Sequence, residues 1–125
     1  MRADKVWVTP PDDGNMFGAM FSVLSPEGYP VAYWLFGRSK DPEEDDGLVY
    51  VERDDQSWST DGGVEQCRLG RDSLKLCFEE SAAAELKSGR EVVIQFDLDD
   101  ARFAALKAAF DSMFQGHQDY EVTAG

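Results

Sequence analysis

The chain of 125 residues carries 25 acidic against 12 basic side chains, which gives a formal net charge of −13 at pH 7. Nucleic acids and anionic membrane surfaces attract cationic proteins, so this charge argues against both and favours a basic protein partner. The length predicts a single domain over residues 1–125, and an apolar content of 42% is sufficient for a hydrophobic core.

The N-terminal segment shows no pattern of export or membrane insertion. Met1–Lys5 leads directly into Val6–Thr9, without the apolar stretch of a signal peptide. No apolar run reaches the roughly 18 residues that a membrane-spanning helix needs. These features predict a cytoplasmic protein.

The first predicted strands are rich in apolar and aromatic residues. Phe17–Leu24 and Tyr29–Phe36 flank Ser25–Gly28, a turn with proline early and glycine late. This arrangement predicts an antiparallel hairpin.

A third strand, Gly47–Glu52, follows a polar and acidic loop. Its residues alternate, so Tyr50 and Glu52 are expected on one face and Val49 and Val51 on the other.

The clearest hairpin joins Val64–Leu69 to Ser73–Glu79. A two-residue turn at Gly70-Arg71 would pair Cys67 with Leu74. The leucines of the second strand share one face, and that face is expected to be buried.

The two cysteines, Cys67 and Cys77, are expected on opposite faces of this hairpin. Side chains that point apart cannot form a disulfide, so both are predicted to be small apolar fillers. The chain has no C-x-x-C motif and a single histidine, His117, which argues against a zinc site.

A short helix and another strand follow. Ser81–Lys87 has the composition of a helix, with Ser81 as its N-cap and an end near Gly89. The apolar residues of Glu91–Phe96 predict a strand in the centre of the sheet.

The last helix has the strongest signals. Asp99 is a good N-cap, Leu98 and Phe103 occupy the positions of a hydrophobic staple, and Gly116 can end the helix. An apolar stripe is expected to pack on one sheet face: Phe103, Leu106, Phe110, Met113 and Phe114. Residues 116–125 are expected to form a loose tail.

These elements predict an α+β fold. We expect an antiparallel sheet of five to seven strands, a C-terminal helix packed on one face and a short helix before the last strand. No internal repeat and no linker divides the chain.

Metal and catalytic motifs match poorly. The acids of Asp41–Glu52 imitate a calcium-binding loop, but Asp46 stands where such a loop needs glycine, and the flanks are strands. No serine elbow, Cys/His pair or phosphate-binding loop is present. The sequence predicts no catalytic residue, no metal ligand and no cofactor. The remaining catalytic alternative is a small hydrolase that uses Glu52 with a second acid.

Acidic residues gather in Asp41–Glu65, which holds ten carboxylates and one base, Arg53. Concentrated negative charge speeds the encounter with a basic protein, and Trp58 or Tyr50 can supply an aromatic anchor. The alternative is that Tyr50 lies in the core, Trp58 covers a loop and the acids cap solvated turns. The expected partner-binding residues are Asp45, Asp46, Glu52, Asp54, Asp55, Gln56, Trp58 and Asp61.

The residues Val49–Gln56, followed by a glycine-containing link and Leu69–Leu76, resemble bacterial immunity proteins of polymorphic toxin systems. The resemblance is to the tenth family of such proteins and covers roughly residues 47–114, with Met113-Phe114 as the family's pair near the helix end. It places Glu52, Asp54, Asp55 and Gln56 at the family's marked positions.

The resemblance implies a protein that binds and blocks a cognate toxin domain, often a nuclease, without catalysis. A nuclease needs a basic cleft for phosphates, and a strongly acidic protein complements such a cleft. The main alternative is an acidic structural or adaptor module that acts as a homodimer through an exposed strand edge.

Overall fold

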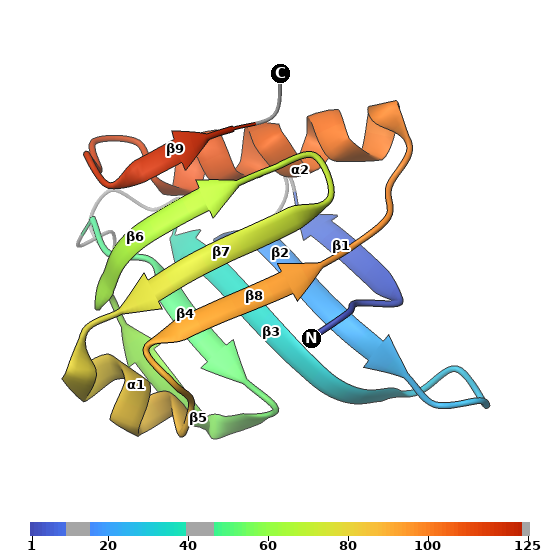
Figure 1. Cartoon of the computed structure of the whole chain (residues 1–125), viewed down its shortest axis with the longest axis horizontal. Helices are drawn as coiled ribbons and strands as arrows, with labels where there is room; N and C mark the ends of the chain where they lie inside the picture. Colours follow the sequence, from blue (N-terminus) through green and yellow to red (C-terminus); the bar gives the residue numbers. More distant parts are fainter. Residues whose placement is uncertain (10–15, 40–46, 124–125) are drawn as a thin grey trace.

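The computed structural model describes residues 1–9, 16–39 and 47–123 and places two helices and nine strands in them (Figure 1). Five strands form an antiparallel sheet in chain order: β1 (Lys5–Thr9), β2 (Met16–Leu24), β3 (Pro30–Ser39), β4 (Tyr50–Arg53) and β5 (Asp55–Asp61). Four strands form a mixed sheet in the order β8-β7-β6-β9: β6 (Val64–Leu69), β7 (Ser73–Phe78), β8 (Glu91–Gln95) and β9 (Tyr120–Val122). Helix α1 (Glu80–Leu86) precedes β8, and helix α2 (Asp100–Met113) precedes β9.

The α+β class is confirmed, with the strands divided between two sheets. The division falls at Gly62 and Gly63, whose φ values are 81° and 83°. Glycine adopts this left-handed backbone without a steric penalty, so the pair lets the chain turn from one sheet into the other. A side chain at Gly63 is also excluded, because its Cβ would lie 2.4 Å from the Cβ of Ala82.

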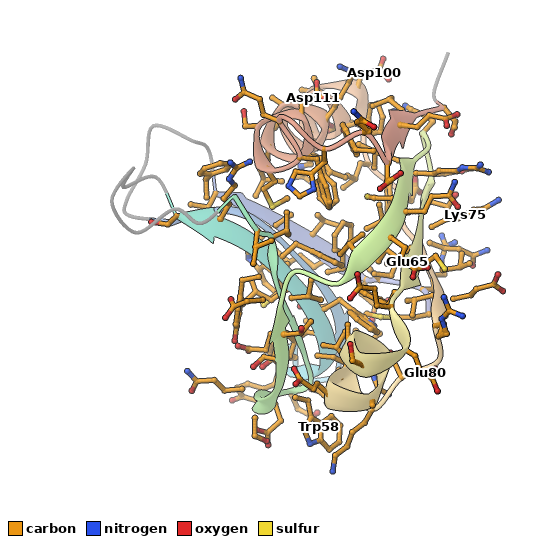
Figure 2. All side chains as sticks on the ribbon, turned by 90° about the vertical axis from the view of Figure 1, so that its left-hand side faces the viewer. Trp58, Glu65, Lys75, Glu80, Asp100 and Asp111 are labelled. Carbon is orange, nitrogen blue, oxygen red and sulfur yellow. The ribbon has the colours of Figure 1, made fainter. Side chains whose placement is uncertain are left out.

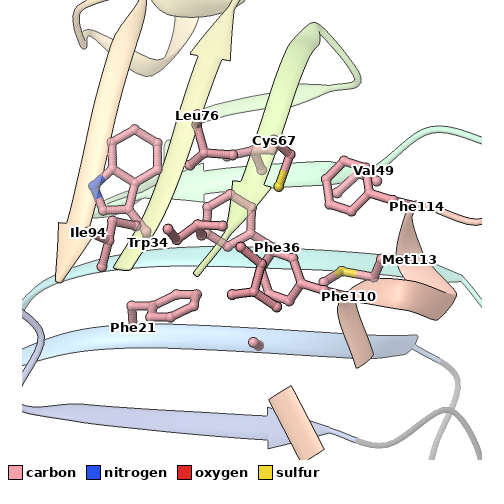
Figure 3. Close-up of a cluster of buried hydrophobic side chains, with 14 of the residues drawn as sticks. Phe21, Trp34, Phe36, Val49, Cys67, Leu76, Ile94, Phe110, Met113 and Phe114 are labelled. Atoms are coloured by element: carbon pink, nitrogen blue, oxygen red, sulfur yellow. The ribbon is translucent and has the colours of Figure 1, made fainter. Parts of the chain in front are cut away.

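The core lies between the two sheets and is largely aromatic (Figure 3). Trp34 of β3 stacks on Phe78 of β7 with ring centroids 5.8 Å apart, and Phe21 of β2 lies 5.8 Å from Phe96. Phe110 of α2 closes one end of this space, 6.2 Å from Phe21. Each fully buried ring contributes roughly 1.5–3 kcal/mol by the hydrophobic effect, so these contacts hold the two sheets together.

Helix α2 matches its prediction at the N-cap and along its stripe. Asp99 Oδ1 accepts the backbone N–H of Arg102 at 2.8 Å. The stripe residues are buried, or half-buried in one case: Phe103, Leu106, Phe110, Met113 and Phe114. At the other end, the Arg38 guanidinium of β3 donates to the carbonyl oxygens of Met113 and Gln115 at 2.8 and 3.2 Å. A cation favours the negative end of a helix, so Arg38 ties α2 to the five-stranded sheet.

Helix α1 differs from its prediction at both ends. Its N-cap is Glu79, and Ser81 lies inside the helix. The chain enters the helix early because the backbone N–H of Glu79 is held by the carbonyl of Gly63 at 2.8 Å. The helix ends at Lys87, which adopts a left-handed φ of 53°, before Gly89 is reached.

The hairpin of β6 and β7 forms in a register two residues away from the predicted one. Cys67 pairs with Leu76 instead of Leu74, because the Gly70 N–H donates to the Ser73 carbonyl at 2.8 Å and closes the turn one residue later. A shift of two leaves every side chain on its expected face. The two cysteines accordingly point to opposite faces, and both are free thiols.

Strand β8 lies at an edge of the four-stranded sheet, so the prediction of a central position was wrong. The N-terminus covers part of this edge. The Ala3 N–H donates to the Gln95 carbonyl at 2.7 Å, and the Gln95 N–H donates to the Met1 carbonyl at 2.8 Å. Hydrogen bonds of this kind occupy the edge of an apolar strand, which could otherwise pair with another chain.

Part of the segment expected to be a loose tail forms strand β9. Tyr120 lies opposite Cys67 in a parallel pairing with β6, and its ring stacks on Phe114 with centroids 5.1 Å apart. The Tyr120 hydroxyl donates to Asp111 at 2.7 Å. Burial and this hydrogen bond both raise the pKa of Tyr120.

Candidate functional site

The predicted site residues of the described chain cluster around strands β4 and β5, at one edge of the five-stranded sheet. We call the face that points away from the four-stranded sheet the outer face. Val49 and Val51 are buried on the inner face, so Tyr50 and Glu52 lie on the outer face, as the alternation predicts. The predicted residues Asp45 and Asp46 lie outside the described residues.

Glu52 is an acidic residue buried in a sheet face. It is 9% exposed, and its carboxylate accepts a hydrogen bond from the Tyr33 hydroxyl and another, at 2.6 Å, from the Tyr50 hydroxyl. Burial and the Glu52 carboxylate raise the pKa of both phenols, so they stay protonated donors at neutral pH. A buried carboxylate is costly unless it is hydrogen-bonded, and the two phenols meet this need.

Asp54 is the residue at which the chain turns from β4 into β5. Its φ is 61°, a left-handed conformation that Asp and Asn adopt more readily than most other residues. Its carboxylate accepts the Tyr33 N–H at 2.8 Å, and its own N–H donates to the Tyr33 carbonyl at 3.1 Å. Asp54 therefore shapes the turn, and it is also exposed at the surface.

Asp55 and Gln56 follow at the start of β5, and both are exposed. The Asp55 carboxylate accepts the backbone N–H and the hydroxyl of Ser57, each at 2.9 Å. The backbone hydrogen bond, with help from the hydroxyl, lowers the pKa of Asp55. This carboxylate thus stays ionised at neutral pH and below.

Asp61 lies opposite Tyr50 on the outer face, at the far end of β5. Within the described part of the chain, no group donates a hydrogen bond to its carboxylate, which is exposed. Among these residues, Asp61 therefore shows no structural role.

Trp58 points to the other side of β5 from Glu52 and Asp61, because β5 alternates between its two faces. Its ring lies between two cations: the Arg53 guanidinium at 5.6 Å and the Lys87 ammonium at 5.1 Å from the ring centroid. Figure 2 shows Trp58 at the α1 end of the molecule. The structure therefore separates Trp58 from the carboxylates of the outer face.

Arg53 has a role that the sequence did not reveal. Its guanidinium donates to the carbonyls of Leu86 and Lys87, at the C-terminal end of α1, at 3.2 and 2.8 Å. It also lies over the rings of Trp34 and Trp58 at 5.9 and 5.6 Å. In the sequence, Arg53 stands out only as the one basic residue of an acidic segment. That pattern does not indicate which groups its guanidinium contacts.

The basic residues of β3 and β4 consequently point inward. Arg38 holds the end of α2, and Arg53 holds the end of α1. On the outer face of the five-stranded sheet, Lys5 is the one cation among the described residues. At the β4–β5 edge, the Arg53 guanidinium also lies 3.8 Å from the Asp54 carboxylate, so Asp54 is partly compensated.

The histidine serves as an attachment point. His117 Nε2 lies 2.7 Å from the Gly47 carbonyl oxygen, and its ring meets Phe114 edge-on at 5.5 Å. These contacts join the chain after α2 to the residues that precede β4.

Among the described residues, no group of three or more His, Cys, Asp or Glu side chains is arranged to hold a metal ion. In the same part of the chain, no helix has the length and apolar character needed to cross a membrane.

Residues 2–104 match the family model for Imm10, Immunity protein 10. The match covers most of the chain and confirms the resemblance seen around β4 and the β6–β7 hairpin. No curated protein and no solved structure shows significant similarity to the chain.

Proposed function

The chain belongs to the immunity protein 10 family, and from this premise we propose that it neutralises a cationic toxin domain by binding it at the β4–β5 edge. Immunity proteins neutralise a cognate toxin and typically do so without catalysis, which agrees with the prediction that the chain is not an enzyme. The contact residues of the proposal are Glu52, Asp54, Asp55, Gln56 and Asp61 of the described chain.

The arrangement of charge carries this proposal. The chain has a net charge of −13, and Asp55 and Asp61 are exposed at the β4–β5 edge, where Asp54 shares the guanidinium of Arg53 with the end of α1. A negative surface with few nearby cations accelerates association with a basic protein and orients it.

A nuclease is the toxin class that this charge fits best. An enzyme that cleaves nucleic acid must present Arg and Lys side chains to phosphates. The carboxylates of Asp54, Asp55 and Asp61 can take the place of those phosphates in charge-assisted hydrogen bonds. Occupation of the cleft would block the toxin stoichiometrically.

The test begins with the genes beside the one for this chain, where we expect a modular protein whose C-terminal domain is toxic; that domain is the partner in the measurements below. The triple variant Asp54→Asn, Asp55→Asn, Asp61→Asn removes three charges. Because asparagine keeps the Oδ1 acceptor and tolerates the left-handed backbone at position 54, the turn should remain intact. We expect the association rate at low salt to fall about tenfold and its dependence on salt to flatten.

A matched control removes three charges elsewhere: Glu91→Gln, Asp97→Asn and Asp119→Asn. We expect this variant to lose far less association rate than the first. Equal losses in the two variants would show that only total charge matters and would contradict the β4–β5 edge as the binding site. A toxin domain that cleaves no nucleic acid would contradict the nuclease class. Failure of a one-to-one mixture to inhibit the domain would contradict neutralisation itself.

A further inference from the structure

The outer face of the five-stranded sheet has an apolar centre that no described helix or strand covers. Trp7, Met20 and Leu35 lie side by side on β1, β2 and β3, because Trp7 pairs with Met20 and Met20 with Leu35. All three are half-buried, and no described helix or strand covers this face (Figures 1 and 2). A soluble domain ordinarily gives polar residues to the exposed face of an antiparallel sheet.

A groove runs beside these side chains. It has a volume of about 340 Å³, and its floor includes Gly18 and Gly37, which are a cross-strand pair. A Cβ atom at Gly18 would lie 1.9 Å from the carbonyl oxygen of Phe36, so packing enforces the absence of a side chain there. With no side chain on either of these two facing residues, a partner side chain can approach the backbone closely at this point of the groove.

The groove and the acidic edge belong to the same surface. The row Trp7, Met20, Leu35 continues across β3 to Glu52, which pairs with Leu35. The next row places Gly37 opposite Tyr50, and Tyr50 opposite Asp61. An apolar group in the groove would therefore have carboxylates and phenol hydroxyls as its immediate neighbours.

We propose that this groove receives a large apolar or aromatic side chain of the toxin, flanked by a lysine or arginine that meets Asp61; this inference rests on the proposed immunity function. Apolar contact gives the complex its lifetime, and the adjacent charges give it orientation. A second copy of the chain is a poorer occupant, because a symmetric contact through this face would bring two acidic edges together.

Charge on the face identifies the occupant as a basic protein. The sole cation among its described residues, Lys5, lies at the β1 edge, with its ammonium 4.9 Å from the Trp7 ring centroid. The carboxylates lie at the opposite edge, on β4 and β5. A partner that approaches the groove with its cationic side toward β5 satisfies both requirements at once.

The first test is a methionine footprint of the wild-type protein. Hydrogen peroxide oxidises accessible methionine, and peptide mass spectrometry locates the added oxygen. With the neighbouring gene's toxin domain bound, we expect the oxidation rate of Met20 to fall at least about tenfold. Met1, which is 40% exposed and lies beside β8, is the internal control and should stay reactive.

The second test is the double variant Met20→Ala, Leu35→Ala, measured against Val93→Ala on the exposed face of the four-stranded sheet. We expect the groove variant to weaken the complex about tenfold or more through faster dissociation, and the control to bind as wild type.

Each outcome separates the two proposals. If the wild-type protein binds and inhibits the toxin while Met20 stays reactive, the groove proposal is wrong and the immunity function stands. If the wild-type protein does not bind, the proposed function fails, and the groove proposal fails with it. A dimer in sedimentation that protects Met20 without toxin would also overturn the proposal, because a second copy would then occupy the groove.

Discussion

The outer faces of the two sheets differ in how their charged and apolar residues are arranged. On the four-stranded sheet, bases and acids are mixed: Arg68 lies 3.9 Å from Glu121, and Arg90 lies 2.9 Å from Glu65. Lys75 occupies the centre of that face (Figure 2). On the five-stranded sheet, an apolar row leads to an edge of carboxylates, with Lys5 as the one cation in the described part.

This difference indicates which face is specialised for a partner. Mixed charges that pair with each other form a solvated surface and attract no particular protein. An apolar groove next to exposed carboxylates that outnumber the cations of the same face is unfavourable in water, and a binding function explains why it is kept. The comparison therefore favours the five-stranded sheet as the recognition surface.

The largest expected effect is a difference in stability between substitutions on the two faces of β3. Phe36 is fully buried, and its neighbour Leu35 is half-buried on the outer face. We expect Phe36→Ala to lower the free energy of unfolding by about 3–5 kcal/mol, and Leu35→Ala by about 1 kcal/mol. Urea denaturation measures both. Similar losses would show that the outer face is packed like the core and would remove the contrast between the faces.

The next largest expected effect is a difference in stability between the substitution of one arginine in each sheet. Arg53→Met removes two charge-assisted hydrogen bonds to the end of α1, and we expect it to cost about 2 kcal/mol. Arg68→Met removes an exposed ion pair at 3.9 Å and should change stability by less than about 0.5 kcal/mol. Thermal and urea unfolding give the values. A loss for Arg68→Met as large as that for Arg53→Met would contradict the view that the four-stranded face is merely solvated.

Local signals in the sequence predicted the parts of the fold that depend on local physics. The N-cap at Asp99 and the stripe through Phe110 were correct, because a helix N-terminus and a period of 3.6 are set by neighbouring residues. The division of Val49 and Val51 from Tyr50 and Glu52 onto opposite faces was correct for the same reason, since strand alternation is local; which face is buried was not predicted.

Features that depend on distant pairing were not predictable in the same way. Strand β5, with the sequence Asp-Gln-Ser-Trp-Ser-Thr-Asp, lacks apolar alternation and forms because β4 offers it an edge. The three-residue strand β9 exists because β6 receives it in parallel. The capping role of Arg53 links residues more than thirty positions apart, and no short pattern encodes such a contact.

The candidate site was predicted in part. The segment around Glu52 proved to hold exposed carboxylates at one edge, but Trp58 lies on the other side of β5 and serves α1. Tyr33, which binds Glu52 and Asp54, was overlooked. Its position in an apolar strand gave no sign that its hydroxyl would meet a carboxylate.

A smaller expected effect is a loss of stability at high pH. Burial and the Glu52 carboxylate raise the pKa of Tyr33 and Tyr50 above the ordinary value of 10.0. A raised pKa in the folded state stabilises the protein fully below the unfolded-state pKa, and this stabilisation is lost as pH rises above it. We therefore expect the free energy of unfolding to decline above about pH 10. Burial likewise raises the pKa of the Cys67 thiol, so part of the decline begins near pH 9.0 in every variant.

Urea titrations between pH 8.5 and 11, on the order of half a unit apart, measure this decline. The variant Tyr33→Phe, Tyr50→Phe should decline less steeply than wild type, because two of the protons released on unfolding are absent. Tyr120→Phe, on the four-stranded sheet, is the control and removes one such proton. A decline as steep as that of wild type in the double variant would show that Glu52 does not hold these phenols protonated.

The smallest expected effect concerns Lys5, the one cation on the outer face of the five-stranded sheet among the described residues. Lys5→Gln makes that face more negative and should raise the association rate with the toxin domain about twofold at low salt. Lys75→Gln makes the same change in total charge on the mixed face, so it should alter the rate less. Both lysines are exposed, and each change should leave stability within about 0.5 kcal/mol of wild type.

Stopped-flow mixing at two salt concentrations measures these rates, and the difference between the variants should vanish at high salt, where charges are screened. Because the two substitutions are chemically identical, any difference between them must come from position. A larger gain for Lys75→Gln than for Lys5→Gln would indicate that the toxin domain first meets the four-stranded sheet. It would contradict the conclusion that the outer face of the five-stranded sheet is the recognition surface.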